Sequence, residues 1–346
     1  MPPLPAELTQ RQQEILRRVV QEFVATGQPV GSKSLVERSG LRVSPSTVRS
    51  ELAELEAKGL LTHPHTSAGR VPTERGYRFY AAGLLERLEP RPRKFELDLP
   101  PSATEVDHAL QATTEKLSRA TRLLALVSAP PLETTTVRHV EVLLLQPEVV
   151  MVVVITSTGG VTKRIIAFEE PVDPGIAAWA REYLNERVAG VQLGSHALRS
   201  RLEDRSFSPR ERGFMDAIRP AFTQVLGDAE RLFVGGAAGL LDDVRAEELA
   251  PYRRVLEMLE QRAALSEILR QALVPNRPFV RVGVELEDAA LRDIAIVGAS
   301  YGVTNRTLGA VSLLGPLRMD YALAIHSVRS AAFALSRFVE EVYEAN

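Results

Sequence analysis

Apolar residues recur every three or four positions in three stretches near the N-terminus, and this spacing predicts three amphipathic helices. The stretches are residues 8–25, 32–37 and 45–58. Ser44 is followed by a proline, which makes it a good N-cap for the third helix, and Gly59 is placed to end that helix. We therefore expect a compact N-terminal bundle in which the third helix begins sharply at Ser44.

Two short strand candidates follow, an apolar one at 60–62 and another at 70–71, and a polar tip separates them. Thr73 then caps a fourth helix that is rich in aromatic residues. Three helices followed by strand, polar tip and strand form the order of a winged helix-turn-helix. On the third helix, positions 48, 52 and 55 are apolar and share one face, whereas positions 46, 49, 50 and 53 share the opposite, small and polar face, a shape that can enter a major groove.

The residues expected to contact DNA fall into two groups. The third helix would read base edges, with Arg49 as the main contact and guanine as its favoured base. This group comprises Ser46, Thr47, Arg49 and Ser50. The wing would hold phosphate or the adjacent minor groove, through His65, Thr66 and Arg70. Lys33 and Arg42 are either further backbone contacts or ordinary surface charge.

The rest of the chain predicts an α+β body, which makes the whole protein a multidomain α+β chain. A proline-rich linker at 89–104 separates a DNA-binding domain at 1–88 from this body. Helices are expected at 106–127 and 321–342, with six antiparallel strands between them. The strands fall at 137–145, 149–156, 161–168, 279–285, 293–300 and 307–314. Together they predict one domain built from 105–169 and 276–346.

A mostly helical block at 170–275 interrupts that domain and is a candidate interaction module. Helices are expected within it at 174–188, 209–226 and 252–273, with a short strand at 232–234. A length of 346 residues is compatible with such a division into two or three domains.

Charge is distributed unevenly along the chain. Residues 1–94 carry 15 lysines and arginines against 10 aspartates and glutamates, and the remainder carries 27 against 34. A basic head on an acidic body favours a polyanionic partner for the head alone. The chain has no cysteine, no visible signal peptide and no apolar run long enough to span a bilayer, so we expect a cytoplasmic protein without membrane contact.

No catalytic or cofactor motif emerges from the sequence. The glycines at 235–239 miss the dinucleotide-binding spacing, and neither a phosphate-binding loop nor a nucleophile elbow occurs. His63 and His65 lack a third ligand nearby, so contact with DNA or solvent is favoured over metal binding. The chain is therefore expected to be no enzyme, and to need no cofactor and no metal.

Two stretches resemble a known family. Residues 64–80 read Pro-His-Thr-Ser-Ala-Gly-Arg-Val-Pro-Thr-Glu-Arg-Gly-Tyr-Arg-Phe-Tyr, and residues 315–321 read Gly-Pro-Leu-Arg-Met-Asp-Tyr. Both are similar to signatures of the HrcA family of bacterial heat-inducible transcription repressors. Ser50 departs from the family pattern, in which Asn is usual at that position.

This resemblance implies a winged-helix domain, a GAF-like domain and an inserted dimerisation domain. It also implies a dimer that represses chaperone operons through an inverted-repeat operator in double-stranded DNA, and that depends on a GroEL-type chaperonin for its active fold. The alternative is a winged-helix repressor that senses a small metabolite in its GAF-like domain.

Overall fold

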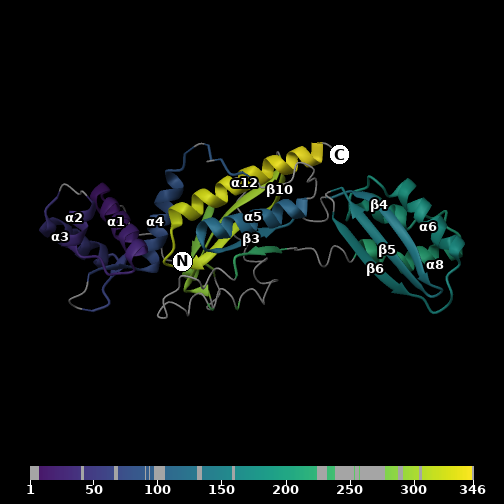
Figure 1. Cartoon of the computed structure of the whole chain (residues 1–346), viewed down its shortest axis with the longest axis horizontal. Helices are drawn as coiled ribbons and strands as arrows, with labels where there is room; N and C mark the ends of the chain where they lie inside the picture. The colour runs from purple at the N-terminus through teal and green to yellow at the C-terminus, as the bar shows by residue number, and fades with distance from the viewer. Residues whose placement is uncertain are drawn as a thin grey trace.

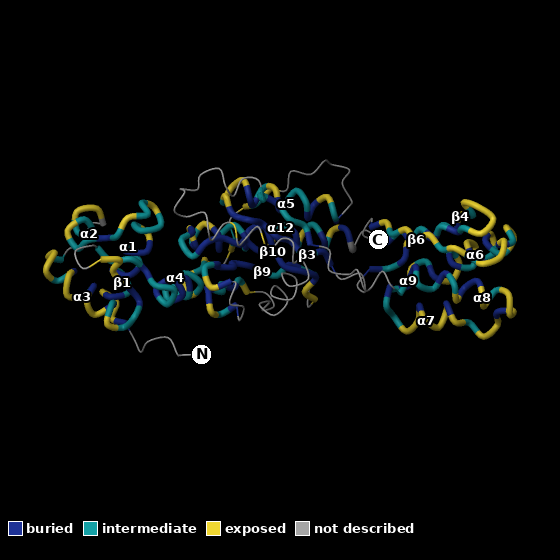
Figure 2. Tube along the Cα trace, turned by 90° about the horizontal axis from the view of Figure 1, so that it is seen from below, coloured by how far each residue is buried: buried dark blue, intermediate teal, exposed yellow. Residues whose placement is uncertain are grey.

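Three bodies lie in a row in the computed structural model (Figure 1). It describes residues 8–39, 43–65, 69–89, 91–92, 94–96, 106–130, 135–157, 160–223, 232–237, 253, 257, 277–286, 291–303 and 306–344. The bodies are a head at one end, a central domain and an insert at the other end. Figure 2 shows that each has its own buried interior. One hydrophobic cluster nevertheless continues from the head into the central domain, whereas the insert has a separate cluster.

The head is a winged helix, as the sequence predicts. Its elements are α1 (Gln10–Thr26), α2 (Ser32–Ser39), α3 (Pro45–Ala57), β1 (Leu61–Thr62), β2 (Val71–Pro72) and α4 (Glu74–Glu86). Thr9 and Gln12 form a capping box at the start of α1, and Gly27 ends that helix in the left-handed conformation. Ser44 caps α3 and Thr73 caps α4 through their hydroxyl oxygens.

The central domain is a five-stranded antiparallel sheet with two helices on one face. The strand order is β7-β3-β10-β9-β8, and α5 and α12 pack on the sheet and on each other (Figure 1). The elements are α5 (Val106–Thr121), β3 (Leu124–Ser128), β7 (Leu232–Gly235), β8 (Phe279–Val282), the 3₁₀ turn η5 (Gly283–Leu286), β9 (Ile294–Val303), β10 (Arg306–Pro316) and α12 (Tyr321–Glu344).

The insert is a three-stranded antiparallel sheet covered on one face by helices. The sheet order is β4-β5-β6. Its elements are β4 (Val137–Gln146), β5 (Val149–Thr156), β6 (Val161–Ala167), α6 (Pro174–Arg187), α7 (His196–Leu202), α8 (Pro209–Ile218) and α9 (Pro220–Thr223). Alternate residues of β5 are buried, namely Val150, Val152 and Val154, and they belong to the same cluster as the inner residues of the helices.

The division of the body differs from the sequence-based expectation. The sequence pattern predicts that the strands at 137–168 join those at 279–314 in one domain, with the insert beginning at 170. They instead form the sheet of the insert, which therefore starts near residue 135. Hydrophobic alternation indicates that a segment is a strand but not which sheet it enters, and that choice is made by long-range packing.

The expected helix at 106–127 is also wrong in its last turns. The helix ends at Thr121, Arg122 takes a positive φ of 56°, and β3 follows. Residues 124–127 are all buried because this strand lies inside the sheet, between β7 and β10. A strand buried on both faces gives an uninterrupted apolar run, which can equally be read as helix.

Two other helix predictions have different outcomes. The one at 209–226 divides into α8 and α9, because Arg219 ends the first helix and Pro220 begins the second. The one at 252–273 lies outside the described residues, apart from Arg253 and Glu257, which are helical. None of the helices in the described part of the chain combines the length and apolar character that a membrane span requires.

Candidate nucleic-acid interface

The helix α3 is set into the head by its apolar face. Val48 and Leu55 are fully buried and Leu52 nearly so, and the helix packs against α1 and α2. Ser44 begins the helix, where its Oγ accepts a hydrogen bond from the Thr47 backbone N–H at 3.2 Å. The orientation of the outer face is therefore fixed by burial on one side and by a cap at one end.

The outer face of α3 is exposed, as predicted. Ser46, Arg49, Ser50 and Ala53 are exposed, and Thr47 is half-buried. The Ser44 hydroxyl lies 2.7 Å from the Ser46 hydroxyl and 2.9 Å from the Thr47 hydroxyl. These hydroxyls form a small network at the start of the helix. Within the described ranges no ion pair involves Arg49, so its guanidinium is available for bidentate contact with a base edge.

The wing is built from three backbone segments, namely β1, β2 and the chain around Val30. Leu61 pairs with Pro72 and Thr62 with Val71, and Val30 exchanges two backbone hydrogen bonds of 2.8 Å with Arg70. Gly69 lies so close to this bridge that an added Cβ would stand 2.5 Å from the Val30 carbonyl carbon. A glycine is therefore required for the wing to approach the α1–α2 turn.

Glu56, at the end of α3, anchors both sides of the wing. Its Oε2 lies 2.8 Å from a terminal nitrogen of Arg70, and its Oε1 contacts Nδ1 of His63. The Arg70 side chain is only 25% exposed. Arg70, expected among the DNA contacts, thus lies at the base of the wing in an ion pair. Sequence reasoning missed Glu56, because no spacing links a helix residue to partners that follow β1 and precede β2.

The other predicted contact residues are placed as follows. His65 is exposed at the edge of the wing tip, and Thr66 lies outside the described residues. Lys33 is exposed on α2, and Arg42 lies outside the described residues. Across the described residues, no group of three histidines, aspartates or glutamates is arranged to hold a metal ion.

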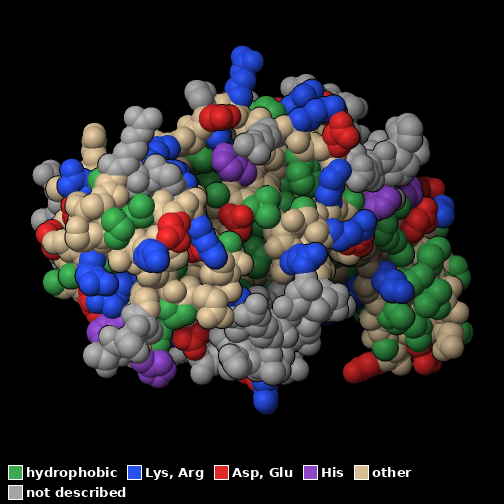
Figure 3. Space-filling model, turned by 60° about the vertical axis from the view of Figure 1, so that its left-hand side comes forward, with side chains coloured by type: hydrophobic (Ala, Val, Ile, Leu, Met, Phe, Trp, Pro, Cys, Tyr) green, Lys and Arg blue, Asp and Glu red, His purple; other side chains and the backbone are tan. Residues whose placement is uncertain are grey.

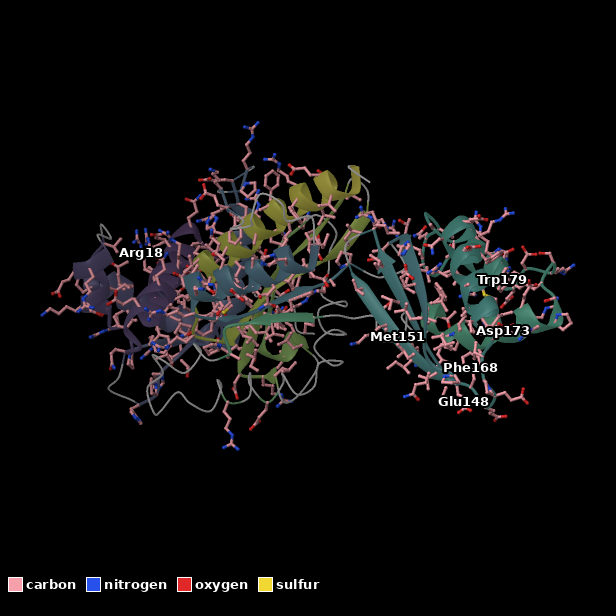
Figure 4. The ribbon with its side chains drawn as sticks, turned by 45° about the vertical axis from the view of Figure 1, so that its right-hand side comes forward. Arg18, Glu148, Met151, Phe168, Asp173 and Trp179 are labelled. Carbon is pink, nitrogen blue, oxygen red and sulfur yellow. The ribbon has the colours of Figure 1, made fainter. Side chains whose placement is uncertain are left out.

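Several other arginines of the head are paired with acidic neighbours. Arg17 lies 2.6 Å from Glu14, Arg38 lies 2.5 Å from Glu22, and Arg11 lies 3.5 Å from Glu51. The hydrogen bond from Arg17 lowers the pKa of the Glu14 carboxyl below its ordinary value. Arg18, which Figure 4 labels on the head, also contacts Glu14, at 2.8 Å. Arg49 differs from these arginines in that it is exposed and takes part in none of the ion pairs found among the described residues of the head.

The fold and this face define a winged-helix DNA-binding protein. The family model of the LexA DNA-binding domain matches residues 5–69, and the model described as "HrcA protein C terminal domain" matches residues 107–325. The chain belongs to the HrcA family of heat-inducible transcription repressors. Members of this family are transcription repressors and not enzymes.

Named relatives support this assignment over nearly the whole chain. The heat-inducible transcription repressor HrcA of Nocardia farcinica is 35% identical, and the match covers 99% of this chain and 99% of that protein. That of Streptomyces avermitilis is 37% identical, with 96% and 99% covered. A crystal structure of a hypothetical protein has the same fold, with a TM-score of 0.67 at 23% identity over 97% of this chain and 100% of that one.

Proposed function

We propose that this chain represses operons encoding chaperones by binding, as a dimer, an inverted-repeat operator in double-stranded DNA in the cytoplasm. The proposal rests on the outer face of α3, where the exposed Arg49 lies between Ser46 and Ser50. The wing beside it is anchored to α3 by the Glu56–Arg70 ion pair. An arginine on a groove-facing helix recognises guanine through two parallel hydrogen bonds. Ser46, Thr47 and Ser50 assist, and His65, Thr66 and Arg70 approach the backbone.

Substitution of Arg49 tests this proposal. Arg49→Ala should lower the ratio of operator to random-duplex affinity by about 1–3 kcal/mol, roughly 5- to 150-fold, because a base-specific contact is lost. Arg138→Ala, at an exposed position in the insert, is the matched control. Fluorescence titration of a duplex from the organism's own chaperone promoters, beside a scrambled duplex, measures the ratio. An unchanged ratio in Arg49→Ala would show that α3 is not the reading helix.

Support for a dimer comes from the side of the insert sheet that no helix covers in the described part of the chain. Here apolar side chains from all three strands lie in register, with Leu143 opposite Met151 and Met151 opposite Ile165. Val161 and Ile165 are each 63% exposed. Figure 4 shows Met151 and Trp179 on opposite sides of this sheet, and Figure 3 shows hydrophobic side chains gathered over the insert. We name Leu143, Met151, Ile155, Val161 and Ile165 the open sheet face.

A second copy of the chain is the occupant we propose for the open sheet face, since large exposed apolar patches mark interaction sites and two identical patches related by a two-fold axis cover each other. Ile165→Lys should convert the dimer into a monomer in sedimentation velocity. Phe333→Lys, at an apolar residue that is 53% exposed on α12, is the control and should leave the dimer intact. An Ile165→Lys protein that sediments as the parent would exclude this face.

Dependence on chaperonin has a physical basis in the topology. β3 pairs with β10, and the Tyr301 hydroxyl of β9 donates a hydrogen bond to the Ser128 carbonyl of β3, 173 residues away in the sequence. The central sheet therefore cannot close until β9 and β10 have been synthesised. Such non-local pairing folds slowly and leaves apolar surface exposed meanwhile. Refolding with and without a GroEL-type chaperonin, followed by operator titration, tests this. Equal recovery of binding would contradict it.

A further inference from the structure

The head is held on the central domain by a buried ion pair. Nε of Arg78, on α4, lies 3.0 Å from Oε1 of Glu285 in η5, and the two side chains are only 8% and 10% exposed. The second carboxylate oxygen of Glu285 accepts a hydrogen bond from the Val282 backbone N–H at 3.0 Å. Both charges therefore have defined partners, and the carboxylate is fixed from two directions.

A second carboxylate of α4 meets the same turn from the other side. Oε1 of Glu74 accepts a hydrogen bond from the Val284 backbone N–H at 2.9 Å. Gly283 takes a φ of +54°, and a Cβ there would stand 2.4 Å from Cδ of Glu74. The turn can thus receive Glu74 only because it carries a glycine. We name Glu74, Arg78 and Glu285 the docking clamp.

Aromatic packing continues the contact beside the docking clamp. Tyr321, at the start of α12, is fully buried, with its ring centroid 5.7 Å from that of Tyr77 and 6.3 Å from that of Tyr80. A terminal nitrogen of Arg318 lies 3.5 Å from the Val24 carbonyl oxygen of α1. The head and the central domain consequently share one hydrophobic cluster.

The helix α4, which carries Glu74 and Arg78 of the docking clamp, is also joined rigidly to α3, the proposed reading helix. The Thr73 hydroxyl donates to the Gly59 carbonyl at 2.7 Å, and the Thr73 backbone N–H donates to the Leu60 carbonyl at 3.1 Å. Gly76 packs so tightly that a Cβ would lie 2.2 Å from the Leu60 oxygen. Since Gly59 and Leu60 come just after Lys58, the C-cap of α3, the direction of α4 determines the direction of α3.

We propose that the docking clamp fixes the orientation of the reading helix relative to the body, and so determines which spacing between operator half-sites the dimer accepts. The inference rests on the proposed function, because it requires two heads on one inverted repeat. Heads on flexible tethers reach many half-site spacings, whereas heads fixed to a symmetric body reach one. Glu74, Arg78 and Glu285 are thus positioning residues for operator selection, although none of them touches DNA.

The test compares duplexes that differ only in spacing. The probe is the inverted repeat that the full-length chain selects from random duplexes, used with its own spacer, with a spacer longer by half a helical turn, about 5 bp, and as a single half-site. The parent should bind the altered spacer on the order of 100-fold more weakly, since the second head no longer engages. Glu285→Gln should reduce this penalty to below about 10-fold and leave half-site affinity within about 2-fold.

Two further variants support the comparison. Glu203→Gln removes the carboxylate from an exposed ion pair of 2.9 Å with Arg219 in the insert, and it should keep the parent's penalty. If Glu285→Gln does not fold, Glu74→Gln tests the clamp through its other carboxylate and should lower the penalty in the same direction.

The outcomes separate the two proposals. A parent that discriminates between spacers, with clamp variants that discriminate equally well, overturns the role of the clamp alone. Clamp variants that lose half-site affinity as well show that the clamp maintains the fold of the head, and this also overturns it. A parent that binds the inverted repeat no better than a single half-site overturns the proposed function together with the inference.

Discussion

Removing one partner of the Arg78–Glu285 pair should cost more stability than removing an ordinary surface charge. An exposed pair contributes about 0–1 kcal/mol. The Arg78 and Glu285 side chains are only 8% and 10% exposed, so this is a buried ion pair. Removing one partner of a buried pair leaves the other charge without its counter-ion and costs about 3–5 kcal/mol. We expect Glu285→Gln and Arg78→Met each to destabilise the joined head and central domain by about this amount.

The double variant, Arg78→Met with Glu285→Gln, tests whether the stability costs of the two single substitutions are coupled or simply add. Once Arg78→Met has removed the guanidinium, replacing Glu285 no longer leaves a buried charge without its partner. The cost of the double variant should therefore fall short of the sum of the two single costs by about 2–3 kcal/mol, at the upper end for residues in contact. Glutamine at 285 can still accept the bond from the Val282 backbone N–H, so packing at the turn is retained.

The chain carries its own internal control for the assay. Its single tryptophan, Trp179, lies in the insert, with its ring centroid 5.6 Å from that of Tyr183 and 5.4 Å from that of Phe207. Urea unfolding followed by tryptophan fluorescence reports on the insert, whereas far-ultraviolet circular dichroism also follows the head and central domain. The variants should shift the second signal and leave the first unchanged. Additive costs, or an equal shift of both signals, would refute the reasoning.

Three further changes have defined outcomes. Glu56→Gln releases Arg70 toward phosphate, so affinity for any duplex should rise at low salt and the slope of log affinity against log salt should steepen by about 1; an unchanged slope would contradict this. Gly76→Ala should cost about 1–3 kcal/mol in urea unfolding through overpacking, whereas Gly83→Ala on the same helix, where an added Cβ would meet nothing within 4 Å, should cost nothing. Burial raises the pKa of the Tyr321 hydroxyl well above its usual 10.0, so the unfolded chain loses this proton first and stability falls as pH rises above 10.0. Tyr321→Phe should remove that part of the pH dependence, and an identical pH profile would show that the hydroxyl plays no part.

Local signals explain which features of the fold could be predicted. Ser44, Gly59 and Thr73 mark helix ends through their own backbone and side-chain chemistry, and the structure confirms all three. The strands of the insert were also located correctly, yet their sheet was not. That choice depends on which helices cover Val150, Val152 and Val154, and period-2 alternation contains no information about distant partners.

The same limit applies within the candidate site. The outward face of α3 follows from helical periodicity alone, so the exposure of Ser46, Arg49 and Ser50 could be predicted. The position of Arg70 could not, because its exposure is decided by Glu56 on another element. Charge in the sequence therefore indicates that the head is basic, but not which of its basic side chains are already paired.

The two stretches that carry the family resemblance meet in space, and this changes what the first of them means. Its second half, residues 73–80, caps and begins α4, with Tyr77 and Tyr80 against Tyr321 of the second stretch. One continuous motif thus supplies the wing and the surface that docks the head on the central domain, so under the proposed function the DNA contact and its orientation cannot vary independently. If a flexible linker lay between the wing and the docking surface, the two could change independently, whereas the direct connection from β2 into α4 couples them.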